Sequence, residues 1–95
     1  MSTDQTFKSV WNAIEASPAA SAHMKMRSDL MIAIQEAVTA WNLTQAQAAK
    51  RLAITQPRLN DLLRGRISKF SLDALVGLAA QAGLDLRLEI SRPAA

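Results

Sequence analysis

The chain has 95 residues, which is enough for a single domain. Hydrophobic residues make up 49% of it but aromatic residues only 4%, and much of the apolar share is alanine and leucine. This composition favours close-packed helices over a β-sandwich, and so short a chain argues against a large cofactor cleft within one copy.

The formal net charge of +3 is unevenly distributed along the chain. Residues 43–70 contain six basic residues and one acidic residue, a net +5, which leaves −2 for the remainder. The residues concerned are Lys50, Arg51, Arg58, Arg64, Arg66, Lys69 and Asp61. Such segregation indicates a surface that faces a polyanion, the alternative being a solvated basic face without a partner.

Several classes of site are disfavoured by what the sequence lacks. There is no cysteine, and His23 is the only histidine, so neither a metal site nor a histidine-activated nucleophile is expected. The first residues have no signal-peptide pattern, and no apolar run approaches 18 residues. We therefore expect a cytoplasmic protein with no cofactor, no metal ion, no membrane contact and no enzyme activity.

Residues 1–20 are predicted to form an N-terminal arm with a short amphipathic helix at about residues 6–16. Phe7, Val10, Trp11 and Ile14 recur at helical spacing, and the pattern breaks at Pro18. A single short helix is marginal alone, so the arm must dock. It either completes the core or binds a partner protein, with Trp11 as the natural anchor.

Residues 21–83 are predicted to form a helical domain. Its first helix begins near Ala20 or Ser28 and stops at Asn42, with one apolar face made by Leu30, Ile34, Val38 and Trp41. The next helix, Gln45 to Leu52, begins at a capping box formed by Thr44 and Gln47. It buries Ala48, Ala49 and Leu52.

A further helix follows after a short break, with Thr55 as its N-cap, Pro57 in its first turn and Gly65 at its end. At 100° per residue, Leu59, Leu62 and Leu63 lie on one side. The opposite side carries Gln56, Pro57, Asn60, Asp61 and Arg64. A helix that is anchored by leucines and shows Gln, Asn and Arg outward suits the major groove of DNA.

The last predicted helix begins after Ser71 and stops at Gly83, with Leu72, Leu75, Val76 and Ala79 as its apolar stripe. The period then changes to that of a strand, because Leu84, Leu86, Leu88 and Ile90 alternate with polar residues. A single strand needs a partner edge, and the simplest one is the same strand of a second chain. Residues 84–95 are therefore predicted to be a dimerisation strand and tail.

The segment LTQAQAAKRLAITQPRLNDLLRGRISKFSLDALVGLA resembles XRE-type helix-turn-helix regulators of the Cro and phage-repressor class. It is most similar to a subgroup in which TQPRLNDLLRG is followed by a FSLDAL helix and a C-terminal strand, commonly HigA-type antitoxins. The resemblance implies an all-α, five-helix, lambda-repressor-like domain with one C-terminal β-strand paired across a homodimer. It also implies operator binding, autoregulation and a RelE/HigB-like toxin as partner.

The resemblance assigns roles to individual residues. It makes Gln56, Arg58 and Asn60 base contacts, and Leu59 and Leu62 the residues that hold the recognition helix. The phosphate contacts are Gln45, Thr55, Arg64, Arg66 and Lys69. If the arm binds a toxin, the contact residues are Phe7, Val10, Trp11 and Ile14.

Two positions depart from the family pattern. Ala53 stands where the turn usually has glycine, so a positive φ there costs about 1 kcal/mol. Asp61 places a negative charge on the DNA face, where it can accept a hydrogen bond from cytosine or, as we expect, pair with Arg58 or Arg64 one turn away.

The sequence thus predicts a dimeric, sequence-specific repressor that binds double-stranded operator DNA, with the antitoxin of a toxin–antitoxin pair as the favoured biology. One alternative is a stand-alone or phage-derived regulator without a toxin. Another is a protein-interaction module whose basic surface binds an acidic partner rather than DNA.

Overall fold

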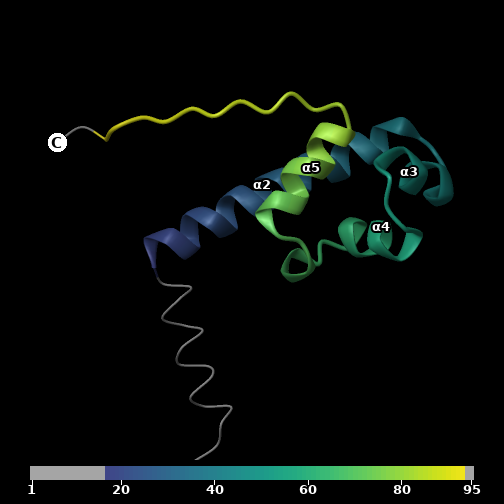
Figure 1. Ribbon diagram of the computed structural model, residues 1–95, viewed down its shortest axis with the longest axis horizontal. Coiled ribbons are helices and arrows are strands. Elements are labelled where there is room, and N and C mark those ends of the chain that lie inside the picture. Colours follow the sequence, from purple (N-terminus) through teal and green to yellow (C-terminus); the bar gives the residue numbers. More distant parts are fainter. Residues whose placement is uncertain (1–16, 94–95) are drawn as a thin grey trace, which may run out of the picture.

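The structure, a computed structural model, describes residues 17–93. These residues form helices α2 (Pro18–Trp41), α3 (Gln45–Leu52), α4 (Gln56–Leu63) and α5 (Leu72–Gln81), with a 3₁₀ turn, η1 (Ile67–Lys69), before α5. The long helix α2 packs along α5, while α3 and α4 pack together at one end (Figure 1). The predicted all-helical class is confirmed, but the fifth helix, predicted at residues 6–16 and carrying Phe7, Val10, Trp11 and Ile14, lies outside the described residues.

Helix α2 begins earlier than the sequence predicted. Pro18 does not interrupt the helix but occupies its first turn, where the missing N–H of proline has no intrahelical partner to lose. The Ser17 hydroxyl accepts a hydrogen bond from the Ala20 amide at 3.0 Å and caps the helix. The predicted stop is confirmed, because Asn42 adopts the left-handed conformation that ends the helix.

One hydrophobic core joins all four α-helices. The largest fully buried side chains come from α2 (Ile34), α3 (Leu52), α4 (Leu59 and Leu62), α5 (Leu75) and the residue after η1 (Phe70). The predicted inner face of α2 is confirmed at Ile34 and Val38, with Leu30 and Trp41 half-buried at its edges. No polar or charged residue of the described chain is fully buried, so apolar burial holds the domain together.

The predicted stripe of α5 is right in part. The Ser71 hydroxyl caps the helix by accepting from the Ala74 amide, and Leu75 and Ala79 are buried as expected. Val76 is exposed, and Leu78 takes the place assigned to it in the core. Leu78 and Ala79, the i+3 and i+4 neighbours of Leu75, share its buried face, whereas Val76 is turned about 100° away from Leu75 around the helix.

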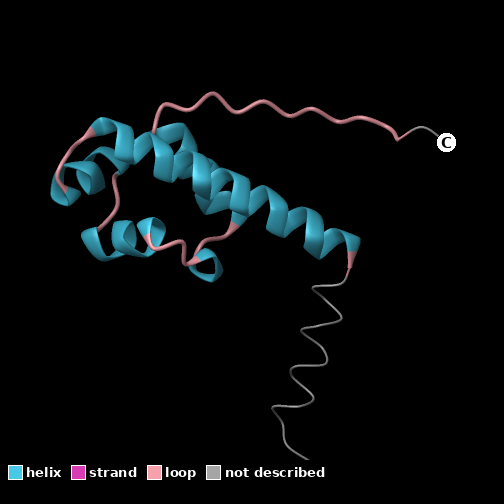
Figure 2. Cartoon of the chain, turned by 180° about the vertical axis from the view of Figure 1, so that it is seen from behind, coloured by secondary structure: helices cyan, strands magenta, loops and turns pink. Residues whose placement is uncertain are grey.

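Residues 84–93 leave the end of α5 as an extended tail, drawn as a loop in Figure 2. The Leu84 amide still donates to the Ala79 carbonyl at 3.0 Å, but residues 85–93 are all exposed. Residues 17–93 contain no strand, so the C-terminal strand is not shown in the single chain. Strand pairing with a second chain stays a prediction.

Of the helices described, none combines the length and the apolar character that a membrane crossing requires.

Candidate nucleic-acid interface

Helices α3 and α4 form a compact pair at one end of the domain. Both halves of the predicted capping box are present in α3, where the Thr44 hydroxyl accepts from the Gln47 amide and the Gln47 side chain accepts from the Thr44 amide. Ala48 and Ala49 are buried, and α3 packs on α4. Their burial confirms the prediction, and such small side chains let the two helix backbones approach closely.

The turn between α3 and α4 depends on Ala53, which ends α3 in the left-handed conformation with φ 58° and ψ 40°. Its amide donates to the Lys50 carbonyl, and the Ile54 amide donates to the Ala49 carbonyl at 3.0 Å. The positive φ predicted for this position is confirmed. The turn therefore carries a steric cost that glycine would remove.

We expect Ala53→Gly to stabilise the fold by about 1 kcal/mol, because it relieves the clash of Cβ with the backbone at positive φ. Urea unfolding of the two proteins at equal concentration measures the change. The matched control is Ala40→Gly in the exposed part of α2, which should instead lose about 0.5–1 kcal/mol. A loss of stability in Ala53→Gly would show that this turn is not strained.

Helix α4 is anchored to the core by two buried leucines and is capped at its start. Leu59 and Leu62 are completely buried, and the Gln35 side chain of α2 donates to the Leu62 carbonyl at 2.8 Å. The Thr55 hydroxyl accepts from the Arg58 amide, which confirms the predicted N-cap. The leucine face is confirmed at Leu59 and Leu62, with Leu63 half-buried. On the polar side Gln56 and Arg64 are exposed, whereas Asn60 and Asp61 are half-buried.

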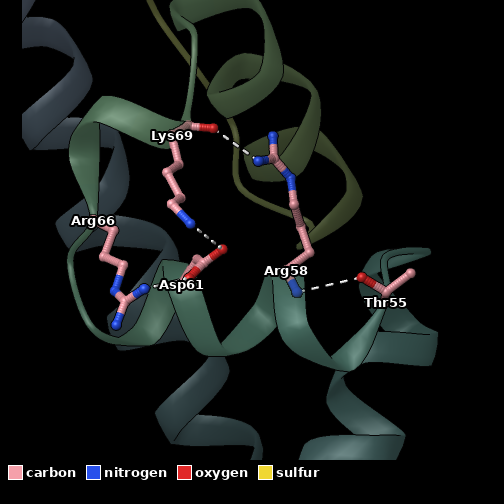
Figure 3. A network of polar contacts seen from close by, with 5 residues as sticks. All are labelled: Thr55, Arg58, Asp61, Arg66 and Lys69. Carbon is pink, nitrogen blue, oxygen red and sulfur yellow. Dashed lines mark hydrogen bonds and ion pairs between the residues drawn. The ribbon is translucent and has the colours of Figure 1, made fainter.

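The three proposed base-contact residues differ in their surroundings. Gln56 is exposed at the first position of α4, and Asn60 is half-buried one turn later. The Arg58 guanidinium donates to the Lys69 carbonyl at 2.7 Å (Figure 3). It also lies 4.1 Å from the centre of the Phe70 ring. A base contact by Arg58 therefore requires it to leave these partners.

Asp61 joins α4 to two of the proposed phosphate contacts. Its carboxylate lies 3.3 Å from an Arg66 guanidinium nitrogen and 3.7 Å from Lys69 Nζ (Figure 3). The predicted pairing with Arg58 or Arg64 is wrong. After Gly65 the chain turns back over the end of α4, where the Arg66 amide donates to the Asp61 carbonyl, so that residues distant by helical spacing become the near neighbours.

A second arginine, which the sequence analysis did not single out, holds the η1 segment from the other side. Arg27 of α2 donates to the carbonyls of Ile67 and Phe70 at 3.5 and 3.4 Å. Arg58 and Arg27 thus bond the carbonyls of Lys69 and Phe70 at the end of η1, and Arg27 also bonds the Ile67 carbonyl, which already accepts from the Phe70 amide at 3.2 Å. Contacts across about 40 residues carry no local sequence signal.

The remaining basic and polar candidates lie on the surface. Gln45, Thr55 and Arg64 are exposed, and Arg64 forms no ion pair with any described residue. Arg51 stacks over the Trp41 ring at 4.1 Å, so that, with Arg58, two of the six basic residues of the segment cover aromatic rings.

The arrangement therefore offers a fixed helix with a polar outer face, flanked by a cationic loop. Amide side chains such as Gln56 and Asn60 carry paired donors and acceptors that match base edges, while Arg66 and Lys69 suit phosphate oxygens. Residues 17–93 contain no group of three or more His, Cys, Asp or Glu side chains that could share a metal ion.

Comparison with known protein families matches residues 14–91 to a family described as a helix-turn-helix domain. A search of curated proteins found no match. The matched range contains α2 to α5 and most of the extended tail. The chain therefore belongs to this family of helix-turn-helix domains, a DNA-binding class.

Proposed function

We propose that the protein is a cytoplasmic, sequence-specific repressor that binds double-stranded DNA through α4. The observation that carries the proposal is that one face of this helix is apolar and buried, while the other carries polar side chains that solvent can reach. Leu59 and Leu62 are fully buried, while Gln56 at its first position is exposed and Asn60 is half-buried. A helix fixed in this way can present hydrogen-bonding side chains to base edges without losing its position in the domain.

In this proposal the polar side chains of α4 read bases and the surrounding groups bind the backbone. Gln56, Asn60 and, after release from Phe70, Arg58 contact bases. The phosphate contacts lie at the start of α3, before and after α4, just before η1 and within η1, namely Gln45, Thr55, Arg64, Arg66 and Lys69. The exposure of Gln45, Thr55 and Arg64 supports these assignments.

We further propose that residues 84–95 join two copies into a homodimer, with residues 21–83 as the DNA-binding domain of each. The tail supports this, since Leu86, Leu88 and Ile90 are exposed although they are large and apolar. A two-fold dimer would place one recognition helix in each of two half-sites about 34 Å apart.

Its biological setting, in our proposal, is that of a HigA-type antitoxin that represses its own operon. The support is the resemblance of the TQPRLNDLLRG and FSLDAL segments to that subgroup. The arm, residues 1–20, would bind the toxin through Phe7, Val10, Trp11 and Ile14. A neighbouring reading frame for a small basic RelE-like protein, toxic alone and neutralised by this chain, would support the antitoxin role. Without such a frame, a stand-alone regulator is the better account.

Fluorescence anisotropy with a duplex from the protein's own upstream region, and with a random-sequence duplex, tests DNA binding. We expect the upstream duplex to bind more tightly and both affinities to fall steeply between two salt concentrations. Equal, weak binding of both duplexes would contradict a specific repressor and favour a protein partner.

Gln56→Ala should weaken binding to the upstream duplex by about 1–3 kcal/mol and leave random-duplex binding nearly unchanged. The loss is selective because an amide that reads a base contributes nothing where the base is wrong. Gln81→Ala is the matched control, since Gln81 is exposed on α5 and donates to the Arg51 carbonyl. An equal loss on both duplexes would remove Gln56 from the base-reading set.

A further inference from the structure

In the extended tail, apolar and charged residues alternate, and this alternation distinguishes the registers in which two copies could pair. Its large apolar side chains become more exposed along the chain, from 43% for Leu86 to 72% for Leu88 and 82% for Ile90. The polar residues between them are charged, and Arg87 forms an exposed ion pair with Asp85 at 3.1 Å. Two copies of this segment related by a two-fold axis pair antiparallel, so the residue on the axis determines which side chains lie opposite each other.

An axis at Arg87 matches the apolar residues but opposes like charges. It places Arg87 opposite Arg87 of the other copy, and Asp85 opposite Glu89 in both halves of the ladder. Like charges directly opposite each other are destabilising in a sheet. Asp85, Arg87 and Glu89 are then all faced by a residue of their own sign, which disfavours this register.

An axis at Leu86 pairs opposite charges but shortens the ladder. It places Asp85 opposite Arg87 in both halves. Ile90, the most exposed apolar residue of the tail, would face Ala82, which is buried at the end of α5. The best candidate for burial would thus gain no strand partner.

An axis at Leu88 satisfies both requirements. It places Leu88 opposite itself and Leu86 opposite Ile90 in both halves, so the three exposed apolar side chains lie against one another. On the other face it places Arg87 opposite Glu89, again in both halves. Resting on the homodimer proposed above, we infer that residues 84–92 form a two-stranded antiparallel ladder between two copies of this chain, centred on Leu88.

The ends of the segment fit this register. The Leu84 amide already donates to the Ala79 carbonyl, so the ladder can begin no earlier than Leu84. Pro93 ends the ladder because it has no backbone N–H to donate to the opposite strand. With Leu88 on the axis, Leu84 lies opposite Arg92, and the whole extended segment between these two limits is paired.

Three single-cysteine variants of the full chain separate the registers, because the natural sequence has no cysteine. A residue on the axis faces itself with Cα atoms about 4.5–5.5 Å apart, which a disulfide can span. In a glutathione redox buffer, Leu88→Cys should form a covalent dimer on non-reducing gels, whereas Leu86→Cys and Arg87→Cys should stay largely uncross-linked. Preferential cross-linking of Leu86→Cys or Arg87→Cys would overturn the register.

Charge reversal gives a second readout in sedimentation equilibrium. Arg87→Glu should lose the dimer, and adding Glu89→Arg should restore it, whereas adding Asp85→Arg should not. If the dimer of Arg87→Glu were restored by adding Asp85→Arg and not by adding Glu89→Arg, the axis would lie at Leu86 and the inference would be overturned. A monomeric wild-type protein would overturn both the dimer and the register, and a dimer insensitive to all of these changes would place its interface elsewhere. The anisotropy measurements report on DNA binding separately.

Discussion

Leu62→Ala is expected to destabilise the domain by about 3 kcal/mol, a large share of the stability of so small a protein. Leu62 is completely buried where α4 meets α2, and its removal leaves a cavity under the recognition helix. Thermal unfolding at fixed protein concentration should show a fall in Tm of more than about 10 °C.

Leu43→Ala is the matched control, because Leu43 is 40% exposed and lies before α3. It should change the free energy of unfolding by less than about 1 kcal/mol. Equal effects of the two substitutions would contradict a core centred beneath α4, and with it the claim that this helix is held rigidly.

The second large effect is expected from replacing Arg66 and Lys69 together with alanine. If both bind phosphates, their loss should weaken binding to random and upstream duplexes by similar factors. It should also lower the slope of log affinity against log salt by about 2, one unit for each contact. Anisotropy titrations at four or five salt concentrations measure the slope.

A double variant with the same change in charge, Lys25→Ala and Lys50→Ala, provides the control. Lys25 forms an exposed ion pair with Asp29 on α2, and Lys50 lies exposed on α3. For this control variant, the slope of log affinity against log salt should stay close to that of the wild-type protein. Equal reductions of the salt slope in both double variants would mean that net charge governs the affinity, and not phosphate contacts by Arg66 and Lys69.

The local features of the fold could be predicted from the sequence because their causes are local. Thr44, Thr55 and Ser71 cap helices through bonds to residues three positions on, and Ala53 takes the positive φ that the helix-to-helix turn demands. The start of α2 was misplaced because Pro18 was interpreted as a helix breaker. At the first turn of a helix, proline costs no hydrogen bond.

The polar network around α4 could not be predicted in the same way. Arg58 reaches Lys69 and Phe70 across more than ten residues, and Asp61 meets Arg66 only because the chain reverses at Gly65. Helical spacing gives candidates within one helix and no information on contacts that a turn creates. Val76 shows a related limit, since the spacing allowed it a place in the core that Leu78 occupies.

The most direct test of DNA binding through α4 is a titration of the ¹⁵N-labelled full chain with the upstream duplex, followed by amide chemical shifts. We expect the largest changes on α4 and its cap, at Thr55, Gln56 and Asn60, with smaller changes at Gln45 and along residues 64–69. Changes concentrated on the exposed residues of α2, with α4 unaffected, would contradict DNA binding through α4.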